Sequence, residues 1–292
     1  MNRRRVVPLL AALQFVMLAT ATATGQAQAD QHALAQRILG RNVEDQSSAV
    51  WAAMTLGSQA TGPELRAALI TLLERNNRIL DEAAKRKVTL DRLIDPEFVA
   101  HVAHAVSQLQ DPQAIPALAG ALGSGSTLVP DALADFGERA AGAVVRVVTN
   151  PETRDHEAVD DGLLSLRFMV EGGGARPLSA GTLGEIRRVA KQRLTGKQYA
   201  PTLWKAIDLA VVLGDPDLRR IVESLAADRS EVVARGIEHA GLIDATQKLA
   251  AGRLAAGGRP FNPRYRTPAE RARALGVPGR GSHGPAVVRP PL

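Results

Sequence analysis

The residues best suited to chemistry are a glutamate and two histidines that lie close together in one apolar stretch. Glu97, His101 and His104 are spaced by four and then three residues. In an α-helix these spacings place all three side chains on one side. Imidazole and carboxylate groups bind zinc and iron, so this set is a candidate metal site. The alternative, which we favour because no fourth ligand accompanies them, is the solvated polar flank of an amphipathic helix.

An acidic cluster and a glycine-rich stretch are the next candidates. Asp155, Glu157, Asp160 and Asp161 lie near the start of a predicted helix, where negative charge complements the helix dipole. They lack the ligand spacing of a calcium loop. The stretch Glu171–Gly181 follows a helix and lacks the lysine and Ser/Thr of a phosphate-binding loop, so it is predicted to be a connector. We therefore expect no catalytic residue, no cofactor-binding residue and no cofactor.

The elements that carry these residues are predicted to be helices. Hydrophobic residues make up 45% of the chain and aromatic residues only 3%, so the core must come from Ala, Leu and Val. Ala and Leu lead the helix-propensity scale. Trp51 and Trp204 fall in apolar helical stretches and are expected to pack in the core. The chain has no cysteine, which excludes disulfides and thiolate chemistry.

Apolar residues at intervals of three and four predict a succession of helices joined by short turns. A Thr182–Glu185 capping box is expected to start one of them. The predicted helices are Asp45–Leu56, Pro63–Leu80, Asp95–Gln110, Gln113–Leu122, Val129–Phe136, Glu138–Val148, Pro151–Val170, Thr182–Leu194, Ala200–Leu213, Pro216–Ala227, Ser230–Ala240 and Ile243–Ala255.

A short phrase, Leu-X-Asp-Pro, recurs at Leu109–Pro112 and Leu213–Pro216. Its aspartate is a preferred N-cap, and its proline suits the first helical position. Asn150-Pro151 is expected to work in the same way. Each such phrase predicts a turn between two antiparallel helices, and stacked helix pairs of this kind form a solenoid. The spacing is irregular, because Pro112 and Pro151 lie 39 residues apart whereas Pro151 and Pro216 lie 65 residues apart. The longer interval predicts an enlarged or degenerate unit that contains the glycine stretch.

Three segments resemble the HEAT-like repeat family, of the bacterial PBS-lyase type. They are LQDPQAIPALAGAL (Leu109–Leu122), LGDPDLRRIVESLA (Leu213–Ala226) and ALADFGERAAGAVVRVVTNP (Ala132–Pro151). The resemblance implies an all-α fold, an α-solenoid of stacked antiparallel helix pairs over residues 30–255. Some HEAT-like hydroxylases carry repeated His-Glu pairs that bind iron. Here that order occurs once, at His156-Glu157, and the pair Glu238-His239 is reversed, so the iron site is not carried over.

The first 29 residues have the three parts of a signal peptide. Arg3–Arg5 give the charged part, Val6–Ala19 the apolar part and Ala27–Ala29 the small-residue cleavage site. We therefore expect a periplasmic or secreted protein with no transmembrane span after cleavage. The alternative is an uncleaved anchor.

The last part of the chain, residues 256–292, is predicted to be a flexible tail rich in Gly, Pro and Arg, with a short helix at 267–275. It carries seven of the arginines and one glutamate. The net charge of the chain is +6, but the signal segment and the tail together hold nine positive charges in excess, which leaves residues 30–255 at −3. Such a body offers no basic face for nucleic acid, whereas the tail suits an acidic partner or an anionic envelope surface.

These observations predict an exported, non-catalytic HEAT-repeat protein that acts as a scaffold or adaptor, with a protein or peptide partner on the solenoid surface. Two alternatives stay open at this point. One is a metal-dependent enzyme or metal-binding protein that uses Glu97, His101 and His104. The other is a structural component of the envelope.

Overall fold

The computed structural model describes residues 28–56, 62–86, 95–126, 128–150, 156–172 and 177–257. Every regular element within these ranges is a helix, which confirms the all-α prediction. The predicted signal segment 1–29 and the predicted tail 256–292, with its short helix at 267–275, lie almost wholly outside them. No described helix combines the length and the apolar character needed to cross a membrane.

The helices mostly agree with the predicted ranges. The first covers residues 28–39. The others are α2 (Val43–Leu56), α3 (Pro63–Arg86), α4 (Pro96–Leu109), the 3-10 helix η2 (Pro112–Ala114), α5 (Ile115–Gly120), α6 (Leu128–Phe136), α7 (Glu138–Thr149), α8 (His156–Val170), α9 (Ala180–Thr195), α10 (Ala200–Leu213), α11 (Pro216–Ala227), α12 (Arg229–Ala234) and α13 (Ala240–Ala256).

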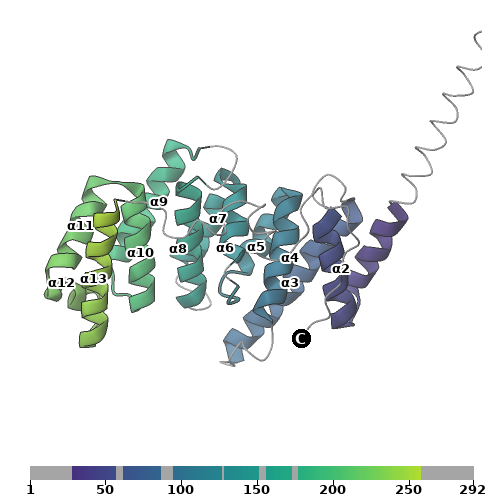
Figure 1. Cartoon of the computed structure of the whole chain (residues 1–292), viewed down its shortest axis with the longest axis horizontal. Coiled ribbons are helices and arrows are strands. Elements are labelled where there is room, and N and C mark those ends of the chain that lie inside the picture. Colours follow the sequence, from purple (N-terminus) through teal and green to yellow (C-terminus); the bar gives the residue numbers. More distant parts are fainter. Residues whose placement is uncertain are drawn as a thin grey trace, which may run out of the picture.

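These helices stack along one axis in two layers, as Figure 1 shows from residues 28–39 at one end to α13 at the other. Layer A consists of α2, α4, α6, α8, α10 and α13, each in contact with the next. Layer B consists of α3, α5, α7, α9 and α11 in the same way. A helix of layer B packs on the following helix of layer A, so the described chain forms the pairs α3/α4, α5/α6, α7/α8, α9/α10 and α11/α13. This arrangement confirms the solenoid-like fold.

Side-chain hydrogen bonds link each pair to the next, and they join residues about 40 positions apart. In layer A, the Trp204 indole donates to the Thr246 hydroxyl at 2.8 Å and the Thr202 hydroxyl donates to Asp160 at 2.6 Å. In layer B, the Asn77 amide donates to the Ala117 carbonyl at 2.7 Å. The separations are 42, 42 and 40 residues. The helix-pair stack therefore has an approximate period in the sequence.

The two Leu-X-Asp-Pro phrases form the turns that join one pair to the next. The Asp111 carboxylate accepts from the Gln113 N–H, and the Asp215 carboxylate accepts from the N–H groups of Asp217 and Leu218. Both aspartates are thus N-caps, as predicted. The residue at the X position of each phrase has a left-handed backbone conformation, with φ of 50° at Gln110 and 63° at Gly214.

The third proposed turn, at Asn150, does not match the other two. Asn150 is the C-cap of α7 and lies within the α7/α8 pair rather than between pairs. Residues 151–155 are outside the described ranges, and α8 begins at His156. The 65-residue interval therefore holds α8, α9 and α10, so the predicted enlarged unit is wrong.

The predicted capping box at the start of α9 is also wrong, because a residue from another helix intervenes. The N-cap is Ser179, whose hydroxyl oxygen accepts from the Thr182 N–H at 3.2 Å. The Ser179 N–H and hydroxyl donate to the Glu138 carboxylate at 2.9 and 2.8 Å, and the Thr182 hydroxyl donates to it as well. Glu185 instead pairs with Arg188. These donors, the Thr182 hydroxyl first, hold the pKa of Glu138 below its usual value.

Arginines satisfy carbonyl groups at the ends of helices from earlier pairs. The last carbonyls of a helix lack partners within it and carry partial negative charge. Arg75 donates to the Leu39 carbonyl at 2.9 Å, and Arg235 donates to the Leu194 carbonyl at 2.7 Å. Arg139 and Arg193 do the same at Gln110 and Val148. These four arginines therefore have a structural use, because a guanidinium combines positive charge with several directed N–H donors.

Candidate functional site

The two histidines of α4 lie in the interior of the stack and not on a solvated flank. His104 is fully buried, and its Nε2 lies 3.0 Å from the Gln108 amide nitrogen, from which it accepts. His101 is also buried, and its ring lies against Trp51 of α2 with centroids 5.0 Å apart. Glu97 is exposed in the first turn of α4. The expected polar flank is wrong for both histidines, because both side chains are buried.

The environment of these residues bears on the metal hypothesis. Burial lowers the pKa of His101, and the negative charges of Glu97 and Asp95 oppose part of that shift. The surroundings of His101 therefore favour its neutral form, which is the form that binds metals. However, no three His, Asp or Glu side chains of the described ranges come together in a group able to hold a metal ion.

The acidic cluster of α8 contacts neighbouring elements. Asp161 accepts a hydrogen bond from the Gly123 N–H at 3.0 Å, at the end of the α5 segment. Asp160 accepts from Thr202 of α10, while Glu157 is exposed in the first turn of α8. Asp155 lies outside the described residues. Burial raises the pKa of Asp161 to about 6, and the charges of Asp160 and Glu157 add to that rise, against the Gly123 hydrogen bond and Lys205.

A buried charge network joins α8, α10 and α13, and the sequence did not predict it. Asp208 of α10 accepts from Arg167 of α8 at 3.2 Å and from Arg253 of α13. Arg167 also pairs with Glu171 at 3.1 Å, and both of these side chains are almost completely buried. The signal was present as single charges within apolar runs, Arg167 in LLSLRFMV and Asp208 in AIDLAVV. A charge in such a run is buried only with a partner.

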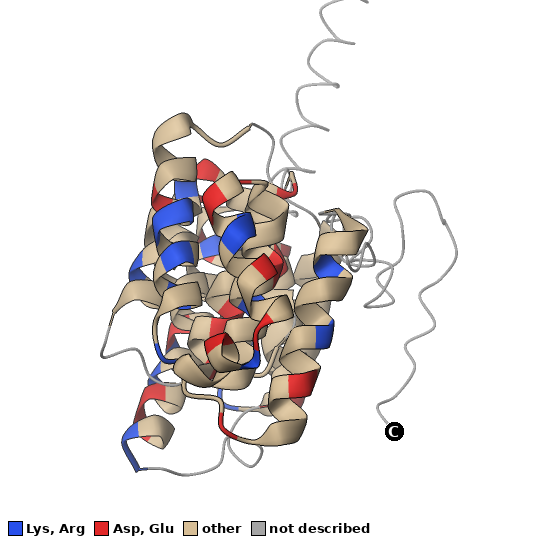
Figure 2. Ribbon diagram, turned by 90° about the vertical axis from the view of Figure 1, so that its left-hand side faces the viewer, with Lys and Arg blue, Asp and Glu red and all other residues tan. Residues whose placement is uncertain are grey.

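The tryptophans behave as predicted. Trp51 and Trp204 are half-buried and pack against the hydrophobic core. His156, from the one His-Glu pair of the sequence, is exposed at the start of α8 and stacks on Tyr199 with ring centroids 5.4 Å apart. Figure 2 views the stack from the α11–α13 end and shows acidic and basic residues lying close together there. Pairs such as Arg219–Glu223 at 2.9 Å and Arg229–Asp244 at 2.9 Å account for this mixture.

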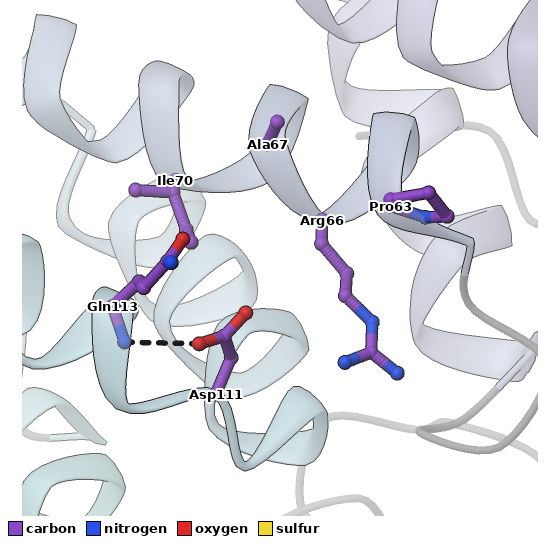
Figure 3. Close-up of a pocket in the computed structure, with 6 residues that line it drawn as sticks. All are labelled: Pro63, Arg66, Ala67, Ile70, Asp111 and Gln113. Atoms are coloured by element: carbon purple, nitrogen blue, oxygen red, sulfur yellow. Dashed lines mark hydrogen bonds between the residues drawn. The ribbon is translucent and has the colours of Figure 1, made fainter.

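A pocket of about 320 Å³ lies where α3 meets the first Leu-X-Asp-Pro turn. Figure 3 shows Arg66 reaching from α3 toward the side of the pocket that holds Asp111, with the Asp111–Gln113 hydrogen bond along one wall. The apolar part of the lining comes from Pro63, Ala67 and Ile70. The pocket therefore combines apolar surface with a cationic group, a carboxylate and an amide, and it lies between two successive helix pairs.

Comparison with known proteins finds no family model and no curated protein that matches this chain.

Proposed function

We propose that the chain is an exported, non-catalytic scaffold or adaptor of the HEAT-like repeat type, which binds a protein or peptide on its stacked helix pairs. The observation that supports this proposal is the two-layer stack of helix pairs, in which side-chain hydrogen bonds join residues about 40 positions apart. That spacing is typical of HEAT and armadillo repeats. Such stacks build an extended surface to which many pairs contribute. The signal-like segment 1–29 supports export.

The pocket between α3 and the Asp111 turn supports a peptide as the ligand. Its volume is at the small end of the range for ligand pockets, which suits one or two side chains of an extended peptide. Arg66 and Asp111 supply opposite charges, so they suit the carbonyl and amide groups of a peptide. Pro63 and Ile70 supply apolar contact.

The test is affinity capture from the exported fraction with three versions of the chain. Ala67→Trp fills the pocket, because Ala67 is exposed on its lining. Gly184→Trp is the matched control, because Gly184 is exposed on α9 and a side chain there meets nothing within 4 Å. We expect a stoichiometric partner with the unchanged chain and with Gly184→Trp, and its loss with Ala67→Trp. A partner set that is the same for all three versions contradicts binding in the pocket.

A fourth version, which ends at Ala256, separates the helix-pair surface from the tail. A partner that is kept by this version binds the helices, and one that is lost requires the arginine-rich tail. Recovery of every version in an insoluble envelope fraction, with no stoichiometric partner, supports a structural envelope component instead.

A further inference from the structure

The two layers of the stack differ in charge. The helices of layer A contain ten acidic and four basic residues, whereas those of layer B contain eight acidic and thirteen basic residues. Layer B is therefore net positive, although residues 30–255 as a whole are net negative. Most of the surplus lies on two neighbouring helices, α7 and α9, which together have two acidic and six basic residues. The fold thus separates charges that are mixed along the sequence.

Contacts at both ends show how α7 and α9 lie side by side. At the two helix starts, Glu138 accepts hydrogen bonds from Ser179 and Thr182. At the two helix ends, Arg193 donates to the Val148 carbonyl, 45 residues before it. The two helices are therefore parallel, and residues 45 positions apart lie at equivalent places along their axes.

Arg146 of α7 and Lys191 of α9 are such an equivalent pair. Both side chains are exposed, and neither has an ion pair or a hydrogen bond among the described residues. Arg187, one turn before Lys191, is also exposed but lies 3.5 Å from Asp215. Packed helices lie about 8–10 Å apart, so two unpaired cations project from neighbouring axes at this spacing. We call the exposed side of the two helices around Arg146 and Lys191 the α7–α9 basic surface.

The acidic residues of α7 and α9 do not neutralise this surface. Glu138 lies at the other end of α7, where Ser179 and Thr182 hold it. Glu185 pairs with Arg188 at 2.7 Å. The large apolar side chains that are exposed in the described chain all lie on other elements. A ligand of the α7–α9 basic surface is therefore held by charge and not by apolar contact.

We propose that the α7–α9 basic surface binds an acidic, extended segment of a protein partner. An extended chain advances about 3.3 Å per residue, so carboxylates about three residues apart match the spacing of the two helices. The Arg146 guanidinium suits a carboxylate, which it can bind through two N–H groups. Neither helix has an aromatic residue on which a nucleic-acid base could stack. This proposal rests on the proposed function in that the ligand is a protein, and it gives that protein a contact outside the pocket.

A defined peptide tests the proposal with the full chain. The probe is a fluorescein-labelled Gly/Ser peptide with Glu at every third position, and the control peptide has Gln in place of each Glu. We expect saturable binding of the Glu peptide that weakens as salt is added. We expect the Gln peptide to bind at least about tenfold more weakly. Equal binding of the two peptides, or no saturable binding of either, overturns the proposal.

Charge reversal tests whether the peptide lies on α7 and α9. Arg146→Glu with Lys191→Glu is expected to weaken binding of the Glu peptide at least about tenfold. The matched control is Lys85→Glu with Arg86→Glu, which makes the same charge change at the exposed end of α3 and is expected to change the affinity less than about twofold. The C-terminal arginines are the same in every version, so their contribution cancels. Equal weakening by the two reversals means that only net charge matters, and it overturns the proposal.

Cross-linking locates the peptide without altering a basic residue. The chain has no cysteine, so Gly142→Cys adds a single thiol one turn before Arg146, where a side chain meets nothing closer than 4.0 Å. A bromoacetyl group on the Glu peptide is expected to react with it at least about tenfold faster than with Gly252→Cys on exposed α13, because bound groups react at a high effective concentration. Both rates are divided by the rate of the same cysteine with bromoacetamide. Equal corrected rates overturn the proposal.

Two more measurements separate this proposal from other readings of the same surface. Ala67→Trp, which fills the pocket, and Gly184→Trp, about 10 Å along α9 from Lys191, are both expected to leave binding of the Glu peptide unchanged. Loss of binding in Ala67→Trp alone places the peptide in the pocket and overturns the proposal. Binding to phosphatidylglycerol vesicles that depends on Arg146 and Lys191, without binding of the Glu peptide, assigns the surface to a membrane and also overturns it. The probes are synthetic, so these failures leave the capture test of the proposed function unaffected.

Discussion

Layer A has an apolar half, α4 and α6, and a charged half, α8, α10 and α13, and the helices of the two halves pack through different kinds of side chain. At the α4–α6 contact neither helix contains a Lys or Arg, and the buried side chains are mainly Ala, Val and Leu. At the α8–α10–α13 contacts, Asp208 accepts hydrogen bonds from an arginine on each neighbouring helix. Apolar contacts tolerate small shifts of one helix along another, whereas a pair of charges requires the two residues to lie at matching positions along the two helix axes. The charged half therefore determines which helix lies beside which more strictly than the apolar half does.

The largest predicted effect is the loss of the charge at the centre of the network. Asp208→Ala leaves Arg167 without one of its acceptors in the interior, and breaking a buried pair typically costs 3–5 kcal/mol. We expect the free energy of unfolding, measured with urea, to fall by about that amount. The matched control is Asp244→Ala, which removes an exposed ion pair with Arg229 and is expected to cost less than about 1 kcal/mol. Equal losses in the two variants would mean that the buried network contributes no more to stability than an exposed ion pair does.

The second prediction concerns Asp161, the carboxylate that connects the charged half to the end of the α5 segment. Its pKa is raised to about 6 in the folded chain from an ordinary value of 3.8. Between those two values the folded state binds more protons than the unfolded state, so stability falls as the pH rises through this window. Asp161→Asn keeps an oxygen for the Gly123 N–H and removes the charge.

We therefore expect Asp161→Asn to stabilise the protein at pH 7.5 by up to about 3 kcal/mol, with a smaller gain at pH 4.5. Urea unfolding at both pH values measures the difference. Asp244→Asn controls for the loss of one negative charge at an exposed position. A gain for Asp161→Asn that is the same at both pH values would show that the buried carboxylate is not responsible.

The sequence predicted the local features of both halves well. The apolar spacing around Phe98 and Val102 placed a helix at Asp95–Gln110, and α4 covers Pro96–Leu109. The N-caps Asp111 and Asp215 were also predicted, because capping depends on residues two or three positions away. Features of this kind are determined by residues close to them in the sequence.

The sequence could not predict what distant helices contribute. The Thr182–Glu185 capping box was a sound local pattern, but Glu138 of α7 holds Ser179 and Thr182 and sets a different N-cap. The environment of His101 depends in the same way on Trp51 of α2, which lies against its ring. The partners in the pair Arg167–Asp208 are 41 residues apart, and only the stacking of helix pairs brings them together.

The two Leu-X-Asp-Pro turns give a third prediction, with one turn in each half. Asp215 caps two N–H groups, lies 3.5 Å from Arg187 and starts the 12-residue helix α11. Asp111 caps one N–H and starts only a three-residue 3-10 helix, because Pro116 has no N–H to continue it. We expect Asp215→Ala to cost about 1–2 kcal/mol and Asp111→Ala about 0.5–1 kcal/mol. Thermal unfolding of both variants measures this, and the reverse order would contradict the comparison.

The last prediction concerns the left-handed residue in each turn. Gly214 needs no stabilising contact at φ of 63°, and a side chain placed there meets nothing within 4 Å. Gln110 adopts φ of 50° with a side chain, which is unfavourable. Its amide compensates, because it donates to the Ser107 carbonyl at 2.9 Å and accepts from Arg139 at 2.8 Å.

Gln110→Gly relieves the backbone and loses both hydrogen bonds, so we expect the free energy of unfolding to change by less than about 0.5 kcal/mol. Gly214→Gln places a side chain on a left-handed backbone without the hydrogen bonds that Gln110 makes. We expect the free energy of unfolding to fall by about 1 kcal/mol. Urea unfolding of the two exchanged variants measures the asymmetry. If Gly214→Gln costs nothing, the hydrogen bonds of Gln110 are not what makes a non-glycine residue acceptable at this position. The two turns would then be interchangeable, although the halves that contain them are not.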